Sequence, residues 1–148
     1  MEKDIIVNDT SLGLLLRDSL LNDGNRDPKF NNIEFKKFTK DELSKIKEID
    51  ITNKGVSDIS ALKYCINLKK LAIQSPNAKR RDTKFAADSA SNYEMEKSKI
   101  KDFSVIEGLS NLEELSIVFE DGLESLDVSG LKKLYYLNLT NNSNLIRY

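Results

Sequence analysis

The chain has 148 residues, with 23 Lys and Arg against 24 Asp and Glu, no His and one Cys, a length typical of a single domain. The lack of histidine removes the commonest catalytic base and metal ligand, and a lone cysteine cannot form an internal disulfide or a thiolate cluster. A net charge of −1 argues against nucleic-acid binding through a broad basic surface, and no apolar run reaches the roughly 18 residues of a membrane span.

The first 45 residues predict two helices. Asp9 is a suitable N-cap for the first helix, and the turn-forming cluster 22–25 ends it. Residues 39–42 (Thr-Lys-Asp-Glu) form a capping-box motif that opens a short second helix. The apolar stripe of the two helices consists of Leu12, Leu15, Leu16, Leu20, Leu43 and Ile46. A sheet that follows them would have an exposed first edge, so we expect residues 1–45 to form a helical N-terminal cap.

Residues 46–148 contain a repeat. The motif apolar-x-x-apolar-x-apolar occurs at 46–51, 68–73, 112–117 and 134–139, with starting points 22 or 44 residues apart. Its last three positions alternate as in a strand with one buried face, which predicts strands near 48–52, 70–74, 114–118 and 136–140. Because one unit cannot bury its own apolar face, we expect the units to stack and their strands to form a parallel sheet.

A period of about 20–29 residues with this motif is typical of leucine-rich repeats. The 22-residue spacing, the segment 54–62 (Lys-Gly-Val-Ser-Asp-Ile-Ser-Ala-Leu) and the run 67–71 (Asn-Leu-Lys-Lys-Leu) resemble bacterial internalin-type leucine-rich-repeat proteins. The resemblance implies an α/β solenoid, a horseshoe segment with the parallel sheet on its concave side and a helical N-terminal cap. One departure is clear. The asparagine that usually follows the strand is present as Asn142, whereas the earlier copies carry Lys54, Pro76 and Glu120.

The segment 76–98 interrupts the repeat by one whole period. It is either a degenerate repeat or an irregular loop on one face, and insertions in such arrays often bind partners. From 69 to 84 the chain has six basic residues and one acidic residue, a balance that would suit an acidic partner. A nucleic-acid site would need a broader basic stripe with stacking aromatic residues, so we expect no nucleic-acid binding.

The segment 107–127 has the opposite charge, with seven acidic residues and no Lys or Arg. The spacing of 120–124 does not match a calcium-binding loop, so we expect a solvated acidic face, neither a metal site nor a general acid–base pair. Cys65 occupies a core position that Leu109 and Leu131 hold in later copies, which predicts a small buried hydrophobic residue and no nucleophile. The sequence thus predicts no enzymatic activity, no metal and no cofactor.

The C-terminal end has no recognisable polar cap. Nine residues follow Leu139, and Leu145 is the last clear core position. Three alternatives are open: the native protein continues, the exposed ends of two chains pair with each other, or the last turn is self-sufficient. We favour the first, which would make the chain a fragment. It would then belong to a secreted or cell-surface protein whose signal lies elsewhere, whereas a complete chain would be cytoplasmic.

The strand residues that face away from the core are the best candidates for a binding surface. The expected partner-binding residues are Lys70, Gln74, Glu114, Val118, Phe119, Tyr136, Asn138 and Thr140. The expected centre is the patch of Val118, Phe119 and Tyr136, since apolar side chains there have no core to fill and Tyr is enriched in interface hot spots. Alternatively, Tyr136 lies flat on its neighbours and Val118 only favours the strand.

These features predict a non-catalytic protein-interaction module that binds its partner through the concave face of the sheet. The resemblance to internalin-type proteins implies recognition of a protein or, less often, of a glycan, by a fragment of a bacterial cell-surface protein. The alternative is a small cytoplasmic leucine-rich-repeat protein that binds and blocks one intracellular protein, such as a toxin or a regulator.

Overall fold

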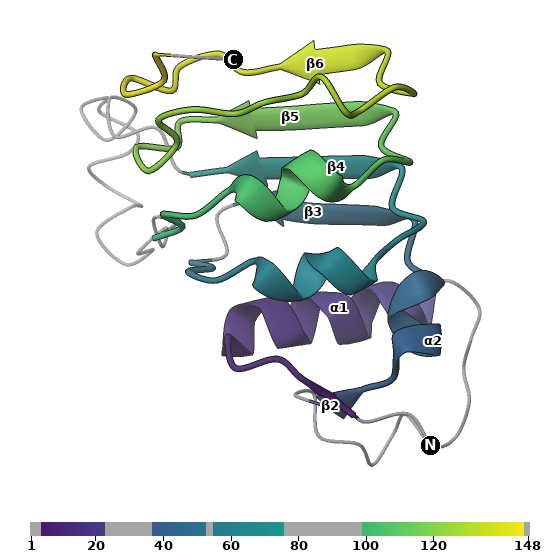
Figure 1. The fold of residues 1–148 in the computed structure, drawn as a ribbon. Coiled ribbons are helices and arrows are strands. Elements are labelled where there is room, and N and C mark those ends of the chain that lie inside the picture. The colour runs from purple at the N-terminus through teal and green to yellow at the C-terminus, as the bar shows by residue number, and fades with distance from the viewer. Residues whose placement is uncertain (1–3, 23–36, 53–54, 76–98, 147–148) are drawn as a thin grey trace.

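The computed structural model describes residues 4–22, 37–52, 55–75 and 99–146. Its main feature is a parallel sheet of four strands in the order β3 (Glu48–Thr52), β4 (Lys70–Gln74), β5 (Glu114–Val118) and β6 (Tyr136–Asn138). Figure 1 shows these strands stacked one above another and pointing the same way. Their register pairs residues 22 or 44 apart in sequence: Ile49, Leu71, Leu115 and Leu137 lie side by side. The parallel sheet predicted from the repeat is therefore confirmed.

Each strand has one buried and one open side. In β3, Ile49 and Ile51 are buried, whereas Glu48 and Asp50 are exposed. The buried side packs against the connecting segments, which include two short 3-10 helices, η2 (Ser60–Tyr64) and η4 (Ser104–Gly108), both visible in Figure 1. We call the other side, which carries Glu48, Asp50 and their neighbours on β4 to β6, the open face. The alternation of the sequence motif is thus the alternation of the sheet.

The same backbone contact joins each strand to the next at its start. The carbonyl oxygen of Lys47 accepts hydrogen bonds from the N–H groups of Lys69, at 2.8 Å, and Lys70, at 3.0 Å. The two later joints use the carbonyls of Lys69 and Glu113, which accept from Glu113 and Glu114 and from Tyr135 and Tyr136 respectively. Because each contact repeats the sequence spacing, the register of the open face is fixed by the period.

Polar side chains next to the repeat motif link neighbouring turns of the coil. The Asn67 amide donates to the carbonyl of Ser44 at 2.8 Å, and the equivalent Asn111 donates to the carbonyl of Ile66 at 2.7 Å. An Asp lies two residues before each 3-10 helix, and its carboxylate accepts from the N–H of the first helical residue, as Asp102 does from Ser104 at 2.9 Å. Asp58 and Asp127 make the same contact with Ser60 and Ser129. These turns reverse the chain without regular structure.

Beyond the ends of the strands, buried polar side chains are joined to one another and to the backbone by hydrogen bonds. Asn142 donates to the carbonyls of Ile117, at 2.7 Å, and Leu139, at 2.9 Å, and its oxygen accepts from the N–H of Glu120 at 2.9 Å. The Glu120 carboxylate, on a residue only 1% exposed, accepts from the hydroxyl of the buried Ser75 at 2.5 Å. Glu120 therefore holds one of the positions where the sequence lacks the expected asparagine.

The helix α1 (Thr10–Asn22) precedes the sheet and contacts β3 (Figure 1). Asp9 caps it, because one carboxylate oxygen accepts from the N–H of Leu12 at 3.1 Å. Its other oxygen accepts from the N–H of Ser57 at 2.6 Å and the N–H of Asp58 at 3.0 Å, in the segment before η2. Burial raises the pKa of Asp9, but these hydrogen bonds outweigh it and leave the pKa lowered.

The second helix, α2 (Lys40–Ser44), follows a short antiparallel pair of strands, β1 (Ile5–Ile6) and β2 (Lys37–Phe38). Thr39 and Glu42 form the capping box predicted from the sequence. The buried Arg17 of α1 donates to the carbonyl of Lys37 at 2.7 Å, pairs with Glu42 at 3.5 Å and lies 4.4 Å from the centre of the Phe38 ring. The guanidinium of Arg17 therefore joins α1 to both β2 and α2.

The last coil differs from the prediction in two ways. The strand β6 ends at Asn138, two residues before the expected 140, because the Asn138 side chain accepts from the N–H of Thr140 at 3.1 Å and turns the chain. Leu137 holds the position of Ile49 but is 39% exposed, since among the described residues no later turn of the coil covers it. The predicted insertion 76–98 and the end of the turn cluster 22–25 lie outside the described residues.

Candidate functional site

The open face is built from rows of side chains that the strand register aligns. The first row runs across the sheet through Glu48, Lys70, Glu114 and Tyr136. The second row consists of Asp50, Ala72, Ser116 and Asn138, and the third of Thr52, Gln74 and Val118. Since the paired residues are 22 or 44 apart in sequence, each row samples one position of the repeat.

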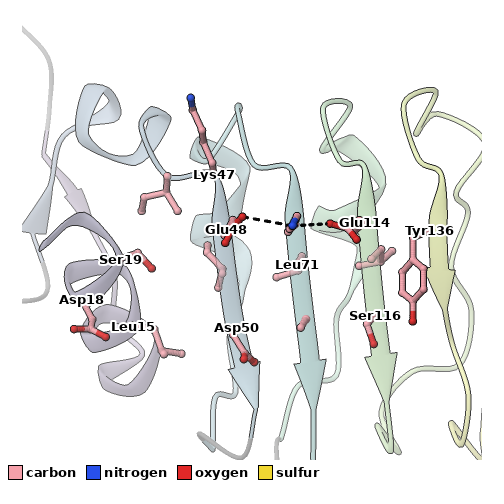
Figure 2. Close-up of a pocket in the computed structure, with 15 residues that line it drawn as sticks. Leu15, Asp18, Ser19, Lys47, Glu48, Asp50, Leu71, Glu114, Ser116 and Tyr136 are labelled. Atoms are coloured by element: carbon pink, nitrogen blue, oxygen red, sulfur yellow. Dashed lines mark ion pairs between the residues drawn. The ribbon is translucent and has the colours of Figure 1, made fainter. Parts of the chain in front are cut away.

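A hollow of about 810 Å³ lies over the first two rows, with α1 along one side. Figure 2 shows its walls, with Leu15, Asp18 and Ser19 on α1 and the Tyr136 ring on the opposite side. The residues that line it are Leu15, Asp18, Ser19, Ile46, Lys47, Glu48, Ile49, Asp50, Lys70, Leu71, Ala72, Glu114, Leu115, Ser116 and Tyr136. A volume in the range of a few hundred to 1,000 Å³ suits a drug-sized molecule or several side chains of a partner.

The first row holds an ion-pair ladder. The Lys70 ammonium lies 3.0 Å from a carboxylate oxygen of Glu114 and 3.7 Å from one of Glu48, as the dashed lines of Figure 2 show. The hydrogen bond and negative charge of Glu114, followed by the charge of Glu48, raise the pKa of Lys70. The Lys70 ammonium thus pairs with two carboxylates, and the three charged side chains together have a net charge of −1.

The second row forms the floor of the hollow, and the side chains at its centre are short. Ala72 and Ser116 have short side chains and lie between the first-row charges and the end of the sheet. Asp50 stands on the side of α1, where its carboxylate accepts a hydrogen bond from the Thr52 hydroxyl. Asn138 is half-buried beyond Ser116. A partner side chain that enters the hollow would therefore meet small groups in the centre and polar groups at its rim.

The structure brings only part of the predicted binding set into the hollow. Lys70, Glu114 and Tyr136 line it, and Tyr136 is 49% exposed. Gln74 and Asn138 belong to the open face but not to the hollow. Thr140 lies in a turn after β6.

The two apolar residues of the predicted patch lie outside the hollow. Val118 is only 8% exposed, so it offers almost no surface to a partner, although alternation places it on this side of the strand. Phe119 is half-buried and has a backbone φ of 59°, a left-handed conformation that is uncommon for a bulky residue. The exposed aromatic surface of the patch is therefore carried by Tyr136.

Sequence reasoning missed contributors to this site that lie outside the strands. Asp18 lies at the rim of the hollow on α1, a helix assigned only a structural role, and Figure 2 shows its carboxylate on the side of α1 away from the strands. Tyr135 is 71% exposed and lies beside the start of the first row, because its N–H donates to the carbonyl of Glu113 at 2.9 Å, as the N–H of Tyr136 does at 3.1 Å. The signal that could have indicated Tyr135 is its position next to Tyr136 in the sequence.

The acidic segment 107–127 does not converge on one point. Glu107 accepts from the N–H of Asp127 at 2.9 Å, Glu114 pairs with Lys70, and Glu120 is buried behind the strand ends. Across the described ranges, no group of three or more Cys, Asp or Glu side chains is arranged to hold a metal ion, and no described helix is long and apolar enough to cross a membrane. Cys65 is fully buried, and this burial raises the pKa of its thiol to about 12.

No family model matches the chain, and no curated protein has a significantly similar sequence. Among solved structures, the chain is similar to an internalin (InlF) of Listeria monocytogenes, with 22% identity and a TM-score of 0.49 over 96% of this chain and 43% of the internalin. It is also similar to internalin C2 (InlC2) of the same species, with 19% identity and a TM-score of 0.38 over 98% of this chain and 76% of that one. The chain thus spans less than half the length of InlF, and both matches are internalins, the family that its repeat resembles.

Proposed function

We propose that the chain is a non-catalytic interaction module that binds a partner protein through the open face of its sheet. The observation that carries the proposal is the hollow of about 810 Å³ on that face, whose lining includes two rows of strand residues that stand in register and point away from the core. The strands beneath it are held by backbone hydrogen bonds at each joint, so the surface is preorganised and little entropy is lost on binding.

The composition of the face suits protein recognition better than catalysis. Tyr136 offers half of its surface, and tyrosine is enriched in interface hot spots. The charges of the first row are paired with one another, and the thiol of Cys65 is buried behind the sheet. An array of this kind offers contacts and orientation, but no activated nucleophile or base among the described residues.

We assign α1 and α2 the role of an N-terminal cap. Leu12, Leu16 and Leu20 are at most 1% exposed, and α1 contacts β3, the first strand of the sheet. An uncovered first strand would present apolar surface and unpaired backbone groups to solvent. The helices would thus protect the first coil and, through α1, also supply one wall of the hollow.

The partner is expected to be a protein outside the cell if the chain belongs to a surface protein, as the resemblance to internalin-type repeats implies. A glycan is the less frequent alternative for such proteins. The lining of the hollow mixes aliphatic, charged and small polar residues with a single aromatic ring, Tyr136, and this composition suits the side chains of a protein segment.

The test is a pull-down with the immobilised chain from candidate host and bacterial extracts, followed by affinity measurement with each purified protein captured. Tyr136→Ser is expected to weaken binding about tenfold or more, as for a hot-spot residue. The matched control is Ile66→Ser, which alters an apolar residue that is 58% exposed but lies outside the hollow. Equal affinities for Tyr136→Ser and the wild type would contradict the proposal.

A further inference from the structure

The hollow on the open face has an unequal distribution of charge. Its lining includes four carboxylates, Asp18, Glu48, Asp50 and Glu114, but only two ammonium groups, Lys47 and Lys70. Lys70 lies between Glu48 and Glu114 and is occupied by both. The surplus negative charge therefore lies on the side where α1 meets β3.

The second lysine does not offset this surplus. Figure 2 shows the Lys47 side chain extending away from the hollow, past the start of β3. Asp50, by contrast, lies on β3 beside the hollow, whereas Asp18 stands at the outer rim, on the side of α1 away from the strands. Within the described part of the chain, neither of them has an ion-pair partner at 4.0 Å or less, and the contact that Asp50 makes is with the Thr52 hydroxyl.

The remaining lining fits the stem of a long basic side chain. Ala72 and Ser116 leave the floor between the first and second rows low, and the half-exposed Tyr136 ring stands at the far wall. Lysine and arginine bury an aliphatic stem along apolar surface while the charged end stays near water or carboxylates. A stem that runs along the second row over Ser116 and Ala72 would direct its cation toward Asp50.

We propose that the open-face hollow binds a lysine- or arginine-bearing extended segment of a partner protein, with the cation at Asp50 and the stem over Ala72 and Ser116. The inference rests on the proposed function and specifies the chemistry of the partner. Charge complementarity selects this occupant, because an acidic segment would face the carboxylates of the lining and an apolar one would leave Asp50 desolvated without a counter-charge.

The test uses the full 148-residue chain and three synthetic peptides that differ at one central position: lysine, the uncharged isostere norleucine, and glutamate. Binding is followed by fluorescence anisotropy at low and high NaCl. The lysine peptide should bind roughly tenfold more tightly than the norleucine peptide, and the advantage should shrink as salt screens the exposed carboxylates. Equal binding of the lysine and norleucine peptides at low salt would overturn the proposal.

The variant Asp50→Asn should remove most of the lysine preference, about five- to tenfold in affinity. The matched control, Asp4→Asn, removes one charge at an exposed position outside the hollow and should retain the preference. An unchanged preference in the first variant contradicts the proposal. Binding of free spermidine in the absence of the lysine peptide would also contradict the proposal. So would a dimer of the chain, detected by sedimentation, that the same variant dissociates.

The same set separates this inference from the proposed function. If Tyr136→Ser weakens all three peptides equally and charge has no effect, the open face binds partners and only the cationic specificity is wrong. If no peptide and no captured protein responds to any substitution in the hollow, both proposals fail.

Discussion

Asn142 has the most connected side chain at the strand ends. Its amide donates hydrogen bonds to the carbonyls of Ile117 and Leu139, and its side-chain oxygen accepts one from the N–H of Glu120. Asn142 is 8% exposed, so water cannot readily replace these partners. This residue joins the third and fourth turns of the coil.

Asn142→Ala should therefore lower the free energy of unfolding by about 2–4 kcal/mol, because three buried backbone groups lose their partner. Urea denaturation followed by circular dichroism measures this. Asn144→Ala is the control: Asn144 is exposed and its amide donates to the carbonyl of Asp121, so the substitution should cost less than about 1 kcal/mol. Similar losses of unfolding free energy in both variants would contradict the expectation that the buried hydrogen bonds of Asn142 stabilise the protein more than the exposed one of Asn144.

Gly122 is required by the close approach of two turns of the coil. A Cβ atom there would lie 2.0 Å from the carbonyl oxygen of Ile100 and 3.1 Å from its carbonyl carbon, both of them backbone atoms. Gly122→Ala should destabilise the protein by about 1–3 kcal/mol, because the backbone of one turn must shift. Gly108→Ala, where a Cβ meets nothing within 4 Å, should change the stability by less than about 0.5 kcal/mol. A thermal melt in which both variants match the wild type would contradict the close approach.

At the scale of elements, Asp9 joins α1 to the segment before η2. One carboxylate oxygen caps the helix, and the other accepts from the N–H and hydroxyl of Ser57 and the N–H of Asp58. The pKa of Asp9 is lowered in the folded protein, so the carboxylate stabilises the fold above its unfolded pKa. This contribution is lost as the pH falls through the folded pKa.

Asp9→Asn should be less stable than the wild type at pH 7, because one amide oxygen cannot serve both sets of donors. The difference should stay constant above about pH 5 and shrink below about pH 4, where Asp9 in the wild type becomes protonated. Asp102 and Asp127, whose pKa values are also lowered by hydrogen bonds from Ser104 and Ser129, are present in both proteins and cancel in the comparison. A difference that does not depend on pH would contradict this role of the charge.

The elements that the sequence predicted best are those that the repeat determines. The strands β3, β4 and β5 coincide with the expected 48–52, 70–74 and 114–118, because a period of 22 residues fixes both the strand and its register. The helix caps at Asp9 and Thr39 were also predictable, because a cap is a contact between residues three apart.

The parts that could not be predicted depend on contacts between elements. Asp18 belongs to the hollow only because α1 lies beside β3, and no local pattern specifies that placement. Val118 follows the alternation of its strand and is nevertheless buried, because burial depends on what surrounds the strand end. Leu137 fits the core motif but is partly exposed, because a motif residue is buried only when a next turn of the coil covers it.

At the scale of the whole molecule, the two sides of the sheet have separate roles. The buried side joins the turns of the coil and α1 into one apolar cluster, whereas the open face collects a charged ladder, a tyrosine and a hollow. The nearly balanced charge of the chain conceals this local order, since the carboxylates of 107–127 are dispersed over the open face, the strand ends and the connecting turns.

The most direct test of the central claim is site-specific photo-crosslinking to a protein captured by the chain. Tyr136→p-benzoyl-phenylalanine places the crosslinker on the open face, and Lys63→p-benzoyl-phenylalanine places it at an exposed position of η2, away from the hollow. Binding through the open face predicts a crosslinked product from position 136 and little or none from position 63. A product from position 63 alone, with none from position 136, would contradict the account.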